Sequence, residues 1–241
     1  MMKRLATIPV TQIVFLFLLS FAGCHSAPGG GSAQDARKLF LQSESALDAV
    51  RSLRMHVEWG NGLYVADSEF ACDQDVVHYT TVQQMPNAPS LRVETVQTTK
   101  YKFARPLEPE AGDWQRTGRE GFPPGVCGRL KSPGVQQYFT NQRFVADWEG
   151  SLPPFFALAN EPGTTITHDG DESIDGVPCE VWTVSKGNHV ANPPQTVWIA
   201  VVDRLPRKYI KGERENPLSV ATYSDYGQTI PIQLPPSDLG Y

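Results

Sequence analysis

The amino-acid sequence predicts a mainly β protein with a few helices, built on an antiparallel sheet. From residue 164 onward, six short apolar segments follow one another with turn residues between them. Residues 53–106 show further alternating segments, whereas one long segment near the start has helical periodicity. Strands therefore outnumber helices and succeed one another along the chain, which is typical of an antiparallel meander.

The first 23 residues have the layout of a cleaved secretory signal peptide. Lys3 and Arg4 precede an apolar run that is shorter than the ~20 residues a membrane span needs. The run ends in "FAGC", which resembles the lipobox of bacterial lipoproteins, although Phe21 departs from its usual aliphatic residue. We therefore expect Cys24 to carry a lipid anchor. The alternative is an ordinary secretion signal in which Cys24 is only a nearby thiol.

Residues 24–34 carry three consecutive glycines and no apolar periodicity, so they are expected to form a flexible linker after the lipidated cysteine. Residues 35–241 are expected to form a single domain, since their length allows one sizeable core. Once Lys3 and Arg4 are removed with the signal, 19 of the 21 basic residues remain against 26 acidic residues. This acidic balance argues against nucleic acid as a partner.

The expected elements can be placed in order along the chain. Residues 32–54 predict a helix, with Ser32 as N-cap and an apolar face formed by Ala36, Leu39, Phe40, Leu47, Val50 and Leu53. Alternation from Leu53 to Trp59 then predicts a strand, and Gly60-Asn61-Gly62 a hairpin turn. The next strands are expected within these ranges: 75–83, 90–99 and 100–106.

Residues 105–133 are rich in Pro, Gly and charge and are expected to be loops around one short strand that carries Trp114. Residues 138–159 are expected to form a helix before Pro153-Pro154 and a short helical turn after them. The remaining strands are expected in six ranges: 164–170, 179–187, 195–202, 207–212, 218–227 and 229–235.

Three cysteines lie beyond Cys24. We prefer a disulfide between Cys72 and Cys127, because both sit beside turn-like residues and the compartment is expected to be oxidising. Cys179 lies inside an apolar strand pattern and is expected to be a buried thiol.

No motif in the chain indicates a metal, a cofactor or catalysis. The cysteines are widely spaced, and no two histidines form a ligand pattern. Residues 169–176 partly match a calcium loop, but Ile174 takes the place of its glycine, so a solvated acidic turn is expected. Nucleophile motifs and phosphate-binding loops are also missing from the sequence. We therefore expect no catalytic residues, no metal site and no cofactor.

The last third of the chain resembles the LolA/LolB-like superfamily, especially its LppX/LprG-type lipoproteins. The resemblance rests on an Asp-Gly-Val turn at residues 175–177, a Val-Trp-Ile strand at 197–199, a Leu-Pro turn at 205–206 and "YSDYG" at 223–227. It implies a strongly curved antiparallel sheet, an incomplete β-barrel, with helices closing its concave side. Curling is physically reasonable for an open sheet of this many strands.

In that family the concave cavity binds lipids or the acyl groups of lipoproteins. The resemblance therefore implies that alternating apolar residues line a ligand cavity here, although each of them could instead fill a dry core. The candidates for the cavity are Met55, Val57, Trp59, Tyr101, Phe103, Trp182, Val184, Trp198 and Tyr223.

Two functions follow from these expectations. The first is a membrane-anchored lipoprotein of the cell envelope that faces the periplasm and binds a lipid or lipoprotein acyl chains for trafficking. The second is a non-enzymatic sensor or scaffold that contacts another envelope protein and has a core filled by its own side chains. His25, rather than Asp, follows Cys24, which favours the outer membrane if the organism has one.

Overall fold

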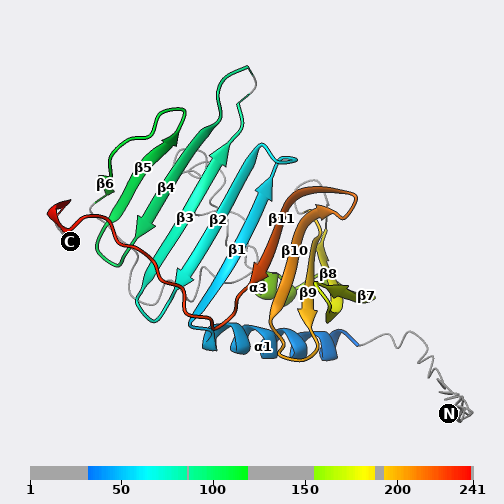
Figure 1. The fold of residues 1–241 in the computed structure, drawn as a ribbon. Helices are drawn as coiled ribbons and strands as arrows, with labels where there is room; N and C mark the ends of the chain where they lie inside the picture. Colours follow the sequence, from blue (N-terminus) through cyan, green and yellow to red (C-terminus); the bar gives the residue numbers. More distant parts are fainter. Residues whose placement is uncertain (1–31, 86, 119–154, 188–192, 240–241) are drawn as a thin grey trace, which may run out of the picture.

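A computed structural model of the protein describes residues 32–85, 87–118, 155–187 and 193–239 (Figure 1). These residues form eleven β-strands, two α-helices and a short 3₁₀ helix at Ser237–Leu239. The helices are α1 (Ala33–Ala49) and α3 (Phe155–Ala159). The strands are β1 (Ser52–Trp59), β2 (Tyr64–Ala71), β3 (Val76–Gln83), β4 (Leu91–Gln97), β5 (Lys102–Glu108), β6 (Gln115–Gly118), β7 (Thr164–Ile174), β8 (Val177–Lys186), β9 (Gln195–Ala200), β10 (Pro206–Glu213) and β11 (Asn216–Ser224).

All eleven strands belong to one antiparallel sheet, in the order β6-β5-β4-β3-β2-β1-β11-β10-β9-β8-β7. Apart from β6 and β7, each strand pairs with the next strand along the chain, and β1 pairs with β11 to join the two halves. The outer strands β6 and β7 do not pair with each other, so the sheet is not closed into a barrel. It bends between the two halves (Figure 1). The prediction of a curved antiparallel sheet that forms an incomplete barrel is confirmed.

Helix α1 starts where the sequence predicts. The Ser32 hydroxyl accepts a hydrogen bond from the Asp35 backbone N–H, and the Asp35 carboxylate accepts one from the Ser32 backbone N–H. This reciprocal pair satisfies two N–H groups at the helix start. The predicted end at residue 54 is wrong. The helix stops at Ala49, and Val50 is extended (φ −69°, ψ 126°), so Leu53 belongs to β1.

Apolar side chains of both helices pack against the concave face of the sheet. Ala36, Leu39, Phe40 and Leu47 of α1 are buried there together with Phe155, Phe156, Leu158 and Ala159 of α3. The helical turn expected after Pro154 is therefore confirmed, whereas the helix expected before the prolines lies outside the described residues. A second, smaller apolar cluster around Trp198 lies on the other face.

Two further expectations need correction. Residues 229–235 form no strand but a segment that runs across the sheet towards β6 (Figure 1). Pro231 lacks the N–H that a ladder requires. Ser52 holds the residues just before this segment, since its carbonyl accepts from the Gly227 N–H and its hydroxyl donates to the Gln228 carbonyl, and Ile230 is buried. The acidic turn expected at residues 169–176 is shorter, because β7 continues to Ile174 and Asp175-Gly176 make the turn.

Candidate functional site

Successive side chains of a strand point to opposite faces of the sheet, so the register assigns every residue to a face. We define the concave face as the one that carries Met55 and Val57, which are buried with the helices. The outer face is the opposite one and carries Arg54 and His56. Strand pairing extends this assignment across the sheet, because directly paired residues share a face.

The helices fill the concave face from β1 towards β7. The ring of Phe40 lies 5.0 Å from that of Phe155 and 5.9 Å from that of Trp182, both edge to face. The rings of Phe155 and Phe156 are 5.7 Å apart. These four aromatic side chains are at most 4% exposed, so this part of the concave face is a packed core.

From β2 to β5, the concave face carries small, hydroxyl and aliphatic side chains. These side chains include those of Ala66, Ser68, Tyr79, Thr81, Val93 and Thr95. Among the described residues of β1 to β5, the concave face has one charged side chain, that of Lys102, whose ammonium lies 5.9 Å from the Tyr79 ring centre. The Ser68 hydroxyl is buried without a hydrogen-bond partner. This face therefore offers little that would hold an ion and much that could contact hydrocarbon.

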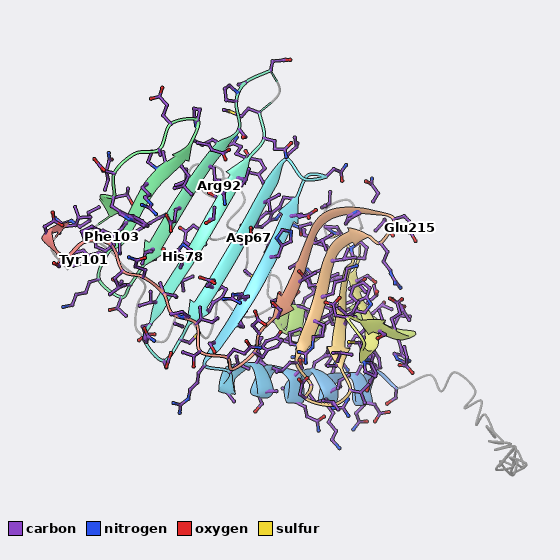
Figure 2. All side chains as sticks on the ribbon, in the orientation of Figure 1. Asp67, His78, Arg92, Tyr101, Phe103 and Glu215 are labelled. Carbon is purple, nitrogen blue, oxygen red and sulfur yellow. The ribbon has the colours of Figure 1, made fainter. Side chains whose placement is uncertain are left out.

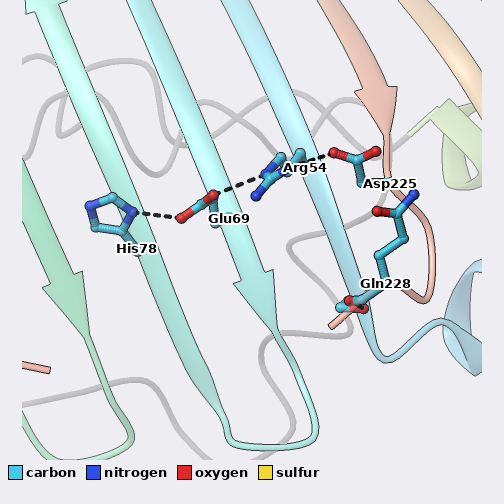
Figure 3. Close-up of polar contacts among 6 residues, drawn as sticks. Arg54, Glu69, His78, Asp225 and Gln228 are labelled. Carbon is cyan, nitrogen blue, oxygen red and sulfur yellow. Dashed lines mark hydrogen bonds and ion pairs between the residues drawn. The ribbon is translucent and has the colours of Figure 1, made fainter. Parts of the chain in front are cut away.

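The outer face has the opposite character. A chain of ion pairs and hydrogen bonds crosses it from Asp225, just after β11, to Arg105 on β5, through Arg54, Glu69, His78 and Glu94. Figure 3 shows its part from Asp225 to His78. His78 lies 3.0 Å from a carboxylate oxygen on each side. These contacts make the outer face charged where it crosses β1 to β5.

His56 on the outer face sits between two carboxylates. Its Nδ1 lies 2.7 Å from Asp67 and its Nε2 lies 3.0 Å from Glu58. Partial burial opposes protonation, but the hydrogen bonds with Asp67 and Glu58 outweigh it and raise the pKa of His56 above its ordinary value. Asp67 and His78 mark this face in Figure 2.

The structure divides the nine predicted cavity residues between the two faces. Six of them lie on the concave face: Met55, Val57, Trp59, Trp182, Val184 and Tyr223. The other three, Tyr101, Phe103 and Trp198, lie on the outer face. Phe103 pairs with Val96 on β4, and its ring is 6.0 Å from that of Tyr101 (Figure 2).

Trp198 has a structural role on the outer face. Its indole N–H donates to Glu172 at 2.8 Å, and the Lys208 and Arg214 cations each lie 5.0 Å from its ring centre. Strand alternation correctly separates Trp198 from its neighbours Val197 and Ile199, but alternation alone does not say which set faces inward. Side chains on both faces of β9 are buried, so hydrophobicity alone could not show which of them turn towards the concave side.

Sequence reasoning missed a polar row along one end of the concave face. We call it the rim row; its residues pair in register across six strands and are Gln195, Lys211, Ser219, Trp59, Tyr64 and Gln83. The row lies at the end of the sheet that carries the β1–β2, β3–β4 and β10–β11 turns, opposite α1 (Figure 1). The sequence offered one signal for this row. Lys211 lies two positions after Tyr209, so the two side chains share a face of the strand.

Below the rim row, the concave face becomes apolar. The second row consists of Val197, Tyr209, Ala221, Val57, Ala66, Thr81 and Val93. Tyr209 links the two rows, since its hydroxyl donates to the Gln195 side chain at 3.0 Å. The Gln83 amide likewise donates to the Tyr64 hydroxyl at 2.8 Å. The concave face is thus amphipathic along the strands, polar at its rim and apolar beneath.

The cysteines agree with part of the expectation. Cys179 is a free thiol that is fully buried, as predicted, and burial raises its pKa. Cys72 is disulfide-bonded, and its partner lies outside the described residues. The pairing of Cys72 with Cys127 therefore stays a prediction.

The described part of the chain contains no cluster of three or more metal-ligating side chains. Within the same residues, no helix is both long and apolar enough to cross a membrane.

Comparison with known proteins identifies the fold. No family model matches the sequence, and no curated protein matches it. Among solved structures, LprF from Mycobacterium bovis superposes with a TM-score of 0.54 and 16% sequence identity, over 86% of this chain and 99% of LprF. The Mycobacterium tuberculosis lipoprotein LppX superposes with a TM-score of 0.50 and 14% identity, over 84% of this chain and all of LppX (100%). The chain therefore has the fold of LprF and LppX, which is the LppX-type fold that the sequence resemblance implies.

Proposed function

We propose that this protein is a lipid-anchored lipoprotein of the cell envelope that holds the acyl chains of a lipid, or of another lipoprotein, against its concave face. The observation that carries the proposal is the contrast between the two faces of β1 to β5. On these five strands, the outer face carries a chain of ion pairs, while Lys102 is the single charged side chain on the described concave face. The function requires no catalytic residue and no cofactor.

The contrast has an energetic meaning. Each methylene of an acyl chain that leaves water for an apolar surface contributes about 0.8 kcal/mol. A charge on that surface would have to lose its hydration and would oppose binding. The outer face of β1 to β4, with Arg54, Glu69 and Glu94, would therefore reject hydrocarbon, and the half-buried part of the second row, Thr81 and Val93, would accept it.

Charge placement on β3 provides the experiment. Thr81 faces the concave side and its neighbour Thr80 faces outward, and both are half-buried. We expect Thr81→Lys to weaken binding of a fluorescent diacylglycerol more than tenfold, because the ammonium would be buried beside acyl chains. Thr80→Lys is the matched control, since it adds the same charge near Asp67 and Glu94. Equal affinity of the two variants would contradict the proposal.

The membrane tether is part of the same proposal. Cleavage after residue 23 would leave Cys24 as the lipidated N-terminus, with residues 25–32 as a leash before α1. Cys24→Ala should release the protein from membranes into the periplasmic fraction. If the variant stays membrane-bound, the anchor is elsewhere. His25 at the second position favours the outer membrane where one exists.

A second candidate function is a sensor or scaffold that contacts an envelope protein. The observation in its favour is the aromatic cluster of Phe40, Phe155, Phe156 and Trp182, which fills one part of the concave face without a ligand. Failure of the native chain to bind any acyl lipid would favour this candidate.

A further inference from the structure

Three large aliphatic side chains are exposed at the end of the sheet that lies opposite α1. Leu63 is 47% exposed in the β1–β2 turn, Met85 is 40% exposed after β3, and Leu218 is 53% exposed near the start of β11. The turns that carry or adjoin them lie at the same end of neighbouring strands (Figure 1). We call these three residues the tip patch. Exposed aliphatic side chains that gather in one place commonly mark a contact surface.

Backbone hydrogen bonds hold the three positions of the tip patch together. The Leu63 carbonyl accepts from the Gln84 N–H at 2.8 Å, directly before Met85. The Leu218 carbonyl accepts from the Gly60 N–H at 3.2 Å, three residues before Leu63. Because these peptide groups are already paired, they would lose little on contact with a medium that offers no hydrogen bonds.

Charged side chains are rare in the chain around the tip patch. Residues 59–66 and 79–91, which include the β1–β2 and β3–β4 turns, contain no Asp, Glu, Lys or Arg, although these types make up 20% of the whole chain. The β10–β11 turn borders the patch with charged side chains, and among them Arg214 is paired with Glu172. Contact of the two neutral turns with an apolar medium would therefore strip no ion of its hydration.

Two aromatic side chains of the rim row lie next to the tip patch along β1 and β2. Trp59 and Tyr64 pair with each other across these strands, and both are half-buried. The Tyr64 hydroxyl accepts from the Gln83 amide at 2.8 Å. Trp and Tyr are favoured at the boundary between hydrocarbon and water, because each combines an apolar ring with a polar group. The order from the tip inwards, aliphatic and then aromatic, matches the order of a bilayer surface from its interior outwards.

We propose that the tip patch docks the protein onto a lipid bilayer, with its three aliphatic side chains inserted between the headgroups and the rim row turned towards the membrane. A bilayer fits the patch better than a protein partner, whose interface would be expected to offer polar groups for hydrogen bonds. The docking is apolar, since the chain has a formal charge of −5 and anionic headgroups would not attract it. The inference goes beyond the proposed function, because it holds whether or not a lipid occupies the concave face.

The expected tether is long enough for this orientation. The leash of residues 25–32 spans at most about 28 Å when fully extended. Strand β1, with eight residues, separates the α1 end of the sheet from the tip patch by about 26 Å. A chain anchored at Cys24 can therefore lay the tip patch on the membrane that holds its anchor.

The experiment places a tryptophan reporter in the tip patch. Full-length protein is incorporated into phosphatidylcholine vesicles whose acyl chains carry bromine, which quenches tryptophan fluorescence on contact. The fluorescence that Leu63→Trp adds to that of the native protein should be strongly quenched. Met85→Ser together with Leu218→Ser in this background should lower the ratio of docked to undocked protein about tenfold, because two of the three inserted side chains are lost.

The opposite end of the sheet supplies the matched controls. In the β9–β10 turn, Val202 is 86% exposed and Val201 is 44% exposed, and Leu41 on α1 is 58% exposed. Val202→Trp should add fluorescence that bromine does not quench. Leu41→Ser together with Val201→Ser should leave the quenching of Leu63→Trp unchanged. All the replaced side chains are exposed, so the variants should keep the fold, which circular dichroism checks.

The possible results separate docking from lipid binding. Equal quenching of Leu63→Trp and Val202→Trp would overturn the proposal, since contact with the bilayer would then not be specific to the tip patch. An unquenched Leu63→Trp would overturn it as well. If that reporter is instead shielded from aqueous iodide only in native membranes, the tip patch binds a membrane protein. The diacylglycerol assay on the concave face is independent of all these results.

Discussion

Replacement of Lys211 by Met should make the protein more stable at neutral pH. Burial lowers the pKa of Lys211 from its ordinary value of 10.5 to about 8. The unfolded chain therefore binds this proton more tightly than the folded chain does. The difference of about 2.5 pKa units corresponds to about 3 kcal/mol, at 1.36 kcal/mol per unit. This is the cost of keeping the ammonium charged in the folded chain at pH 7.

The same linkage fixes the pH dependence. The cost is fully present below pH 8, where the lysine is charged in both states. It falls as the pH rises from 8 to 10.5, because the folded chain then no longer holds the charged form, and it is gone once the lysine is neutral in both states. Lys211→Met has no such cost at any pH. Its stability advantage over the native protein should thus be about 3 kcal/mol at pH 7 and should shrink by a similar amount towards pH 10.5.

Urea unfolding followed by circular dichroism at pH 7, 9 and 10.5 measures this difference directly. Lys208→Met serves as the control for general effects of alkaline pH and of lost charge, and its difference from the native protein should stay constant. A Lys211→Met variant that is less stable than the native protein at pH 7 would refute the reasoning. An advantage that does not change with pH would refute it as well.

Three further predictions concern the rest of the fold. Phe40→Ala should lower the free energy of unfolding by about 3–5 kcal/mol, since Phe40 is 1% exposed within the aromatic cluster; thermal or urea unfolding measures it. His56→Gln should remove a contribution to stability that is present below pH 6.5, the ordinary pKa, and is lost as the pH rises through the raised pKa of the folded state; unfolding from pH 5 to 8 measures it. Peptide mapping without reduction should find Cys72 linked to Cys127, and Cys127→Ser should cost about 2–5 kcal/mol.

The order of the elements could be predicted from the sequence because local patterns encode it. Alternation from Leu53 to Trp59 and the Gly-rich turn after it locate β1 and the β1–β2 hairpin. The capping pair of Ser32 and Asp35 locates the start of α1. The end of α1 was harder, because Val50 and Leu53 fit both a helical face and an alternating strand. Tertiary pairing of β1 with β2 and β11 decides in favour of the strand.

The site could be predicted only in part, since it depends on which face of each strand turns inward. Alternation places Tyr101 with Phe103 correctly, but their face follows from pairing with β4, which local sequence does not encode. The rim row is a long-range feature as well. Lys211 and Trp59 are more than a hundred residues apart, and strand pairing through Ser219 brings them onto one line.

Native mass spectrometry of the full-length protein, extracted from its own membranes in mild detergent, tests the central claim most directly. We expect a mass above that of the lipidated chain by one phospholipid or by a comparable acylated molecule. The same adduct should be depleted in Thr81→Lys and retained in Thr80→Lys. A native protein that carries no acyl ligand, and takes up none when phospholipid is added, would contradict the claim.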